Sequence, residues 1–440
     1  MVMRTMDGRW GPLIERLGSM DARIGIIGLG YVGLPVAIDF AKSGFTVIGV
    51  DVSERRVEEV QSGVSDLVDV DPDDLIALRN AGRLTATTCY EPVSDCDAIL
   101  ICVPTPLLDG APDLSPITSA ATALSKVLSP DTLVVLESTT YPGTTEDLLR
   151  PLLEIGDRAC GSEFLLAFSP ERIDPGNPHY SFSDIPKIVG GCSPDATVAA
   201  EILYSHVVPK VVTVPTPREA EMAKLIENTF RHVNIGLVNE LAVYAHELGI
   251  DIWEAIEAAS TKPFGFMPFY PGPGWGGHCI PLDPAYFSYS VRQFRGHDIR
   301  FVETAHTVNS EMPRHIVERV ADLLNNSSRA VRGSNILAIG VAYKAGTEDT
   351  RHSPAFKVLD GLIRRGAEVS YHDPLVPEAT IAGTQQRSVA LTKERVGDAD
   401  LVLVLSRQHD VDWDLLASGA DLIFDTCNAF GRVDDNIIRL

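Results

Sequence analysis

Residues Arg23 to Asp51 read RIGIIGLGYVGLPVAIDFAKSGFTVIGVD. The β-rich run RIGII leads directly into the glycine-rich turn GLGYVG, and the following LPVAIDFAKSG has the apolar spacing of a helix. A second β-rich run, FTVIGV, ends at Asp51. Strand, turn, helix and strand in this order predict a βαβ unit, the building block of a parallel sheet.

The three glycines of this turn have the spacing that a dinucleotide requires. Gly28 permits the tight turn, Gly30 lets a pyrophosphate approach the backbone, and Gly33 lets the helix pack closely on the strand. The start of the helix also offers unpaired N–H groups to phosphates. Asp51 would accept hydrogen bonds from ribose hydroxyls and repel a 2′-phosphate, so NAD is expected rather than NADP.

Four residues beside these belong to the same expected cofactor site or bear on it. Tyr31 and Val32 lie within the turn and are counted with it as cofactor contacts. Arg55 and Arg56 follow Asp51 and favour a phosphate near the ribose, although either could instead reach the pyrophosphate.

Two further β-rich runs predict more strands of this sheet. They are AILICVP (98–104) and TLVVLEST (132–139), and each ends in a turn with a threonine, Thr105 or Thr139. Ligands of open parallel sheets bind at the carboxyl ends of strands, so both threonines are candidate cofactor contacts. Helix capping is the alternative role for both.

A long helix is predicted from about Arg218 to Leu248, where apolar residues keep helical spacing and no proline intervenes. About 30 residues make a helix of ~45 Å, long enough to link two domains and support a subunit contact. Four polar residues of this helix are spaced by three and four, so they form a stripe on one face: Glu221, Lys224, Asn228 and Arg231. The stripe is either a solvated face or part of a site.

Another helix, DIWEAIEAAST, follows, and then the loop PGPGWGGHCIPLDP (271–284). Its glycines and prolines fix tight turns and permit close approach, an unusual setting for a structural cysteine. We therefore expect the loop to present a reactive group, and the reactive atom in it is the sulfur of Cys279.

The last third of the chain predicts a second parallel α/β sheet. NILAIGV (335–341) is a strand and residues 355–365 a helix, and the strands AEVSYHDP, DADLVLVLS and DLIFDT follow. The loop after the first strand holds Lys344 and Arg351 in place of a glycine motif. Cations at a strand's carboxyl end suit an anionic group such as a diphosphate.

Composition excludes several classes of function. The 440 residues imply two or three domains, and a net charge of −23 argues against nucleic acid. The seven cysteines include no CxxC pair, so reduced thiols are expected rather than a zinc site or disulfides. No window reaches the ~18 apolar residues of a membrane span, and no secretory segment opens the chain. The cytoplasm is the expected compartment, and residues 13–17 suggest a short amphipathic helix.

The chain resembles the nucleotide-sugar 6-dehydrogenases of the UDP-glucose/GDP-mannose dehydrogenase family. The resemblance rests on GLGYVGLP (28–35), CVPTP (102–106), ESTTYPGTTE (137–146), FSPERIDPGN (168–177), EMAKLIENTFRHVNIGLVNELA (221–242), GPGWGGHCIPLDP (272–284) and GVAYKAGTEDTRHSP (340–354). It implies oxidation of a nucleotide sugar at C6, from alcohol to carboxylate, with two NAD.

Within the family, the stretch 260–284 and the PLIERL helix most resemble the UDP-N-acetylglucosamine 6-dehydrogenases. The enzymes for UDP-N-acetylmannosamine are similar too, but carry basic residues where Pro263 and Gly265 stand and usually lack Pro281. UDP-N-acetylgalactosamine and UDP-glucose remain further candidates. Pro175 falls where UDP-glucose dehydrogenases carry a second acid, which puts the role of that acid here in doubt.

The resemblance also implies roles for individual residues. Cys279 matches the nucleophile, which would form a thiohemiacetal and then a thioester, and Lys224 matches the catalytic lysine. The remaining catalytic matches are Asn228, Asp283 and Glu171. Those for the substrate are Arg172, Ile173, Lys224, Asn228, Arg231, Gly276 and Lys344; those for the cofactor include Asp51, Arg56, Thr105, Thr139 and Arg351.

We accordingly expect two Rossmann-like doubly wound sheets joined by a helical connector with a long central helix. The expected domains are 1–213 for NAD, 214–320 for the lysine and the cysteine loop, and 321–440 for the UDP-sugar. A homodimer through the long helix and a role in surface polysaccharide precursors are also expected. A two-electron dehydrogenase of the hydroxyacid type and an inactive nucleotide-sugar binding protein are the rival hypotheses.

Overall fold

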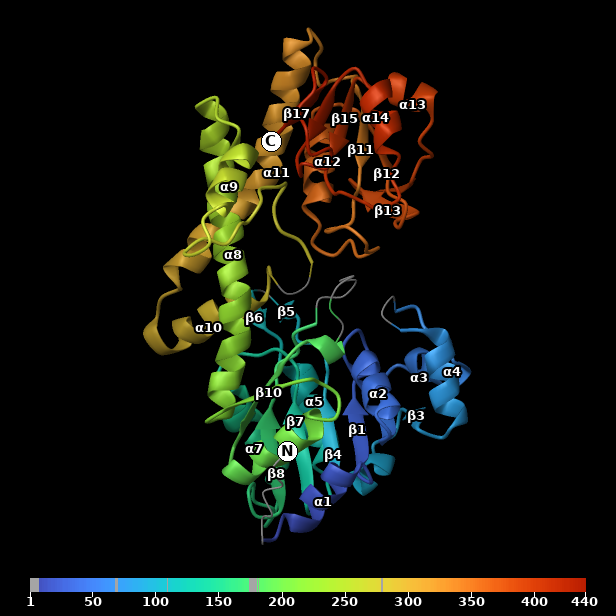
Figure 1. Cartoon of the computed structure of the whole chain (residues 1–440), viewed down its shortest axis with the longest axis vertical. Helices are drawn as coiled ribbons and strands as arrows, with labels where there is room; N and C mark the ends of the chain where they lie inside the picture. Colours follow the sequence, from blue (N-terminus) through green and yellow to red (C-terminus); the bar gives the residue numbers. More distant parts are fainter. Residues whose placement is uncertain (1–7, 68–69, 109, 174–179, 181, 278–279) are drawn as a thin grey trace. The chain divides into compact units, whose positions relative to one another are not determined.

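The computed structural model describes residues 8–67, 70–108, 110–173, 180, 182–277 and 280–440. The chain forms two compact units, each with its own sheet (Figure 1). The first unit contains the chain up to Glu227 together with Arg292–Phe294, and the second contains Asn228–Val291 and Arg295–Leu440.

The first unit is built on an eight-stranded sheet in the order β10-β9-β8-β7-β4-β1-β2-β3. Its paired strands are parallel except β8 and β9, which run antiparallel. The strands are β1 Arg23–Ile27, β2 Thr46–Val50, β3 Leu84–Thr87, β4 Ala98–Ile101, β7 Thr132–Leu136, β8 Phe164–Phe168, β9 Lys187–Gly191 and β10 Val211–Val214; a small hairpin joins β5 Leu107–Leu108 to β6 Ala111–Pro112.

Both faces of this sheet are buried, because successive residues of its strands enter different cores. Leu133 and Val135 of β7 belong to the core that includes α1, α2 and α7, whereas Val134 and Leu136 face α5. The helices are α1 Gly11–Ser19, α2 Gly33–Lys42, α3 Glu54–Ser62, α4 Pro72–Asn80, α5 Ser115–Leu124, α6 Arg150–Leu153 and α7 Pro194–Tyr204, with the short turns η1 Glu91–Asp95, η2 Thr144–Leu149 and η3 Phe182–Asp184.

The long helix expected from the sequence is α8, which runs unbroken over Pro217–Glu247 (Figure 1). Its residues up to Glu227 belong to the first unit and the following ones to the second. Among the described residues, no helix is both long enough and apolar enough to cross a membrane.

The second unit holds a five-stranded parallel sheet in the order β12-β11-β15-β16-β17. Ile336 and Ala338 of β11 enter one core and Leu337 and Ile339 the other, so this sheet is also covered on both faces. The strands are β11 Asn335–Ile339, β12 Glu368–His372, β15 Leu401–Val404, β16 Ile423–Asp425 and β17 Ile437–Arg439, with the hairpin β13 Glu378–Ile381 and β14 Thr384–Arg387; the helices are α9 Ile252–Ser260, α10 Asp283–Arg295, α11 Arg300–Asn326, α12 Pro354–Arg364, α13 Lys393–Gly397 and α14 Trp413–Gly419.

The predicted fold class, two doubly wound α/β sheets with a helical region between them in the sequence, is confirmed. The pairing of β8 with β9 departs from the all-parallel expectation. Among the described residues, no α-helix lies between these two strands, only the three-residue 3-10 helix η3, and a parallel connection usually runs through an α-helical crossover. The three domain boundaries remain a prediction.

Candidate functional site

The glycine turn joins β1 to α2, and each of its glycines meets a different spatial demand. Gly28 has a φ of +94°, and a Cβ there would lie 2.6 Å from the carbonyl oxygen of Cys102. A Cβ on Gly33 would lie 1.8 Å from the carbonyl oxygen of Gly28, so the helix packs too closely for any side chain. Gly30 has open space where a Cβ would be. The turn is therefore tightly packed at Gly28 and Gly33 and open at Gly30, which is the arrangement that a bound pyrophosphate requires.

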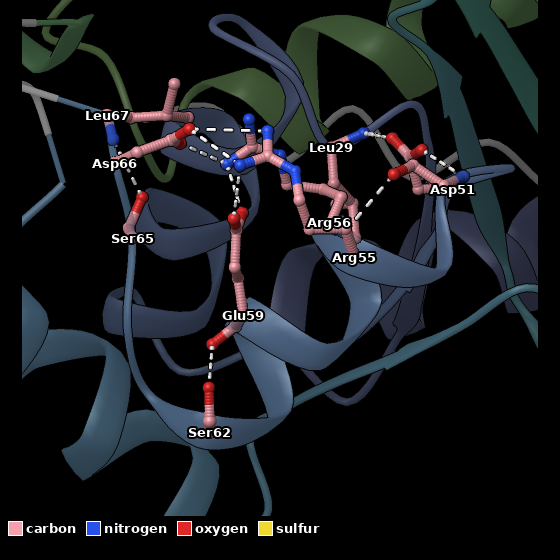
Figure 2. Close-up of polar contacts among 10 residues, drawn as sticks. Leu29, Asp51, Arg55, Arg56, Glu59, Ser62, Ser65, Asp66 and Leu67 are labelled. Atoms are coloured by element: carbon pink, nitrogen blue, oxygen red, sulfur yellow. Dashed lines mark hydrogen bonds and ion pairs between the residues drawn. The ribbon is translucent and has the colours of Figure 1, made fainter.

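Asp51 follows β2 and is held beside this turn by two backbone groups (Figure 2). Its Oδ2 accepts from the N–H of Leu29 at 2.7 Å, and its Oδ1 accepts from the N–H of Ser53 at 2.8 Å. The carboxylate is thus fixed next to the residues that would carry a dinucleotide, which fits the ribose contact expected of it.

The two arginines after Asp51, Arg55 and Arg56, form ion pairs with acidic side chains (Figure 2). Arg56 lies 2.6 Å from Asp66 and 2.7 Å from Glu59, and Arg55 pairs with the same two carboxylates. The hydrogen bond from Arg56 is the largest of several effects that lower the pKa of Asp66. The structure therefore places Arg56 in a local ion-pair cluster, and its predicted contact with the cofactor stays a prediction.

The loops that follow β4 and β7 are joined at the carboxyl edge of the sheet. The hydroxyl of Thr105 donates to the carbonyl oxygen of Thr139 at 2.8 Å, and the hydroxyl of Ser138 donates to the carbonyl oxygen of Val103 at 2.7 Å. Thr105 and Thr139 thus come together, as their places at two strand ends predicted. Tyr31, in the glycine turn, is half exposed, and Val32 packs against the core.

Glu171 and Lys224 form a buried pair in the first unit. Glu171 follows β8, which is parallel to β7, so it emerges at the same edge of the sheet as Thr139. Its carboxylate accepts from the N–H of Ile173, and its Oε2 lies 3.9 Å from Nζ of Lys224. Burial raises the pKa of Glu171, although the charge of Lys224 opposes the shift. A shielded carboxyl beside an ammonium can exchange protons with a reacting group.

Glu221 stands one turn before Lys224 on α8, and no role was predicted for it beyond membership of the polar stripe. It is fully buried, and its carboxylate accepts from the N–H of Gly143 at 2.6 Å, the N–H of Thr145 at 2.9 Å and the hydroxyl of Thr145 at 2.7 Å. These contacts tie the start of α8 to the segment after β7. The signal in the sequence was its spacing of three from Lys224.

Arg172, predicted to contact the substrate, is held by a second residue of α8. Its Nη2 and Nε donate to the two carboxylate oxygens of Glu227 at 2.6 and 3.2 Å, and its Nη1 donates to the carbonyl oxygen of Pro186. These three hydrogen bonds fix the orientation of the Arg172 guanidinium.

In the second unit, Asn228 and Asp283 are both buried, and the Asn228 amide donates to the Asp283 carboxylate. These two predicted site residues therefore come together. Cys279, the predicted nucleophile, lies outside the described residues. Arg231 is exposed on α8.

The segments on both sides of Cys279 are anchored within the second unit. A Cβ on Gly276 would lie 2.6 Å from Cβ of Tyr343, and the N–H of Gly277 donates to the carbonyl oxygen of Arg351 at 3.0 Å. After the loop, the carbonyl oxygen of Ile280 lies 3.1 Å from Nδ1 of His232. Sequence reasoning missed His232, because a histidine inside a helical pattern gives no sign of a distant partner.

Lys344 and Arg351 lie in the loop after β11, as predicted. Nζ of Lys344 is 5.7 Å from the centre of the Tyr343 ring, and Arg351 pairs with Asp349 at 2.6 Å. Their contacts with substrate and cofactor stay predictions. In the described part of the chain, no group of three or more His, Cys, Asp or Glu side chains could hold a metal ion.

Three models of the UDP-glucose/GDP-mannose dehydrogenase family match the chain: the NAD binding domain over residues 22–208, the central domain over 218–311 and the UDP binding domain over 337–432. The UDP-N-acetyl-D-mannosamine dehydrogenase of Pyrococcus horikoshii is 37% identical over 80% of this chain and 84% of its own length. The UDP-N-acetyl-D-glucosamine 6-dehydrogenase of Pseudomonas aeruginosa is 33% identical over 81% and 83%. A solved structure of the Pyrococcus horikoshii enzyme covers 95% of this chain and 98% of its own, with a TM-score of 0.84 and 33% identity.

Proposed function

The chain belongs to the UDP-glucose/GDP-mannose dehydrogenase family of NAD-dependent oxidoreductases, and from this premise we propose that it oxidises C6 of a UDP-N-acetylhexosamine to the carboxylate, UDP-N-acetylglucosamine first. The main observation that supports this proposal is the buried pair of Lys224 and Glu171. It sets a cation and a carboxyl of raised pKa at the carboxyl edge of a sheet whose glycine turn fits a dinucleotide.

NAD, when bound, supplies the hydride acceptor for both oxidations. We assign the covalent step to Cys279, whose thiolate would attack the C6 aldehyde; the thiohemiacetal becomes a thioester, and water releases the acid. Lys224 would stabilise the oxyanion with its charge, and the Asn228 amide, oriented by Asp283, would donate to the same oxygen. Glu171 is our candidate for moving a proton at the C6 hydroxyl or at the hydrolytic water.

Two observations support an acetamido sugar. The stretch 260–284 resembles enzymes of that class, and the names of both relatives above specify N-acetylated hexosamines. The Pyrococcus horikoshii relative, a mannosamine enzyme by name, makes the manno epimer the second candidate. The galacto epimer and UDP-glucose follow.

The test is NADH formation with UDP-N-acetylglucosamine, its galacto and manno epimers, UDP-glucose and GDP-mannose, with NADH counted per sugar consumed. We expect the highest kcat/KM with an acetamido sugar and two NADH per molecule, and no such turnover by Cys279→Ser, because a serine hydroxyl ionises far less readily than a thiol. A preference for UDP-glucose would reject the acetamido class. One NADH per sugar would reject the four-electron reaction, and no NADH with any sugar would favour the inactive binding protein.

We further propose a homodimer formed through α8. Four large side chains of this helix are exposed at spacings of seven, four and three, so they share one face: Phe230, Leu237, Leu241 and Tyr244. An apolar face of this kind is typical of a protein interface. A cytoplasmic location and a role in surface polysaccharide precursors remain predictions.

A further inference from the structure

Two cysteines of the first unit, Cys160 and Cys192, lie close to each other and away from the residues of the proposed reaction. Cys160 precedes β8 and forms an isolated bridge with Phe164, the first residue of that strand. Cys192 follows β9 and donates its N–H to the carbonyl oxygen of Leu166 at 2.8 Å. Because β9 runs antiparallel to β8, the chain that leaves β9 runs back along β8 and reaches Leu166 at Cys192, two residues from the Phe164 that bridges with Cys160.

Phe164 and Leu166 lie two residues apart on one face of β8, β7 occupies the other edge of that strand, and both cysteines pack against the same core, so the two thiols are neighbours. A hydrogen bond from the Cys192 thiol is the main reason why the pKa of Cys160 is lowered, and the positive charge of Arg150 adds to the effect. The same hydrogen bond raises the pKa of Cys192, which keeps its proton. Glu154 faces the pair too, since it accepts the Cys160 N–H at 3.0 Å and pairs with Arg150 at 3.0 Å.

Exposure distinguishes this pair from the buried thiols of the chain. Cys160 and Cys192 are both half-buried, whereas Cys96 and Cys102 are buried. Burial raises the pKa of Cys96 to about 12 and that of Cys102 well above its usual range, so both stay protonated and unreactive. Reactive thiols in proteins combine thiolate character, access and a neighbouring resolving cysteine.

We propose that Cys160 and Cys192 are a peroxide-oxidisable dithiol, with Cys160 as the attacking thiolate and Cys192 as the resolving thiol. The Cys160 sulfur attacks one oxygen of hydrogen peroxide, the O–O bond breaks, and sulfenic acid and hydroxide form. The Cys192 sulfur then attacks the Cys160 sulfur, the S–O bond breaks, and a disulfide and water result. In total, two thiols lose two electrons and two protons, and the peroxide is reduced to two waters.

The disulfide would form away from the carboxyl edge of the sheet. Cys160 lies before β8, whereas Glu171 lies after it, at the opposite end of the strand. None of the residues given a role in the proposed reaction would be consumed. The inference is therefore independent of the proposed function and of Cys279.

The experiment treats the reduced full-length protein with hydrogen peroxide, blocks the remaining thiols by alkylation and maps the tryptic peptides without reduction. Trypsin releases Cys160 in residues 159–172 and Cys192 in residues 188–210, so the disulfide joins two otherwise separate peptides. We expect this cross-linked species, lighter by two hydrogens than the sum of its parts, and its loss after treatment with a dithiol reductant. Cys192→Ser should instead accumulate Cys160 sulfenic acid that dimedone traps, and Cys160→Ser should leave Cys192 unoxidised.

Cys89, an exposed cysteine of the same unit, is the internal control. At neutral pH, iodoacetamide should alkylate Cys160 several-fold faster than Cys89, and the difference should shrink in Cys192→Ser, which has lost the thiol donor. The proposal is overturned if Cys160 and Cys89 react alike in the wild type, or if Cys160 cross-links to another cysteine in preference to Cys192.

Discussion

The carboxylate of Glu221 is buried among donors, and two opposing effects set its protonation. Hydrogen bonds from Thr145 and Gly143 and the charge of Arg218 favour the ionised form. Burial outweighs them and raises the pKa of Glu221 to about 7. Because this carboxylate ties the start of α8 to the segment after β7, it positions Lys224 without touching a reacting atom in the proposed mechanism.

Glu221→Gln should reveal this protonation as a change in the pH dependence of stability. A pKa that is raised on folding adds stability below the unfolded value of about 4.5, and that stability is lost as the pH rises through about 7. The free energy of unfolding of the wild type should therefore fall relative to Glu221→Gln by about 2 kcal/mol between pH 5 and pH 8. Thermal unfolding of both proteins across this range measures it. A constant difference would mean that Glu221 does not titrate in this window.

Also at the residue scale, we expect Asp51 to determine the choice between NAD and NADP. Hydrogen bonds from the N–H groups of Leu29 and Ser53 hold its carboxylate beside the glycine turn, where we expect it to repel a 2′-phosphate. The wild type should use NAD much better than NADP, and Asp51→Ala should reduce that preference about tenfold or more, because each unpaired ribose contact costs about 1–2 kcal/mol. The ratio of kcat/KM for the two cofactors measures the effect. Equal use of NADP by the unchanged enzyme would contradict the assignment.

At the scale of the element, the turn between β1 and α2 separates two uses of glycine. Gly33 has no room for a side chain, because the backbone of Gly28 occupies that space. Gly30 has room, and we expect that space to belong to the cofactor. The same substitution should therefore have different effects at two positions three residues apart.

Gly33→Ala should lower the free energy of unfolding by about 2 kcal/mol or more, since the added carbon would force the helix away from the strand. Gly30→Ala should change stability by less than about 0.5 kcal/mol and raise KM for NAD more than it lowers kcat. Thermal unfolding and steady-state kinetics are measured on both variants, and each variant serves as the control for the other. Normal NAD binding by Gly30→Ala would show that the pyrophosphate does not approach this carbon.

At the scale of the whole molecule, the exposed face of α8 bears on assembly. Leu241 lies between Leu237 and Tyr244 on this face, and 49% of its surface is accessible. If a second copy covers this face, a charge at its centre would be buried without a partner in the dimer.

Leu241→Glu should convert a dimer into a monomer, as measured by light scattering after size-exclusion chromatography. Leu241→Met keeps the apolar volume and should stay dimeric, which controls for any general effect of substitution. Circular dichroism should show the same helix content in all three proteins, because the side chain is exposed within the chain. A wild type that is monomeric at assay concentrations, or a Leu241→Glu variant that stays dimeric, would reject the interface.

The two sheets, the long helix and the glycine turn could be read from local patterns, because apolar periodicity and glycine spacing depend on neighbours in the chain. The helix α11 and the hairpin of β13 and β14 were not predicted. In α11, Pro313 stands inside the helix and interrupts the pattern on which such a prediction depends. The residues proposed for the site came from motifs, and the roles of most of them await the experiments above.

By itself, the sequence determined the family, the cofactor class and the positions of Lys224, Glu171, Asn228 and Asp283, since these stand in motifs of fixed spacing. Only the tertiary structure decided which groups meet: the Glu221 carboxylate with the N–H groups of Gly143 and Thr145, the His232 ring with the Ile280 carbonyl oxygen, and Cys160 with Cys192. The physical reason is range. Glycine geometry and helical faces are set within a few residues, whereas the partners of a buried carboxylate or thiol lie far away in the chain and are chosen by the order and direction of the strands.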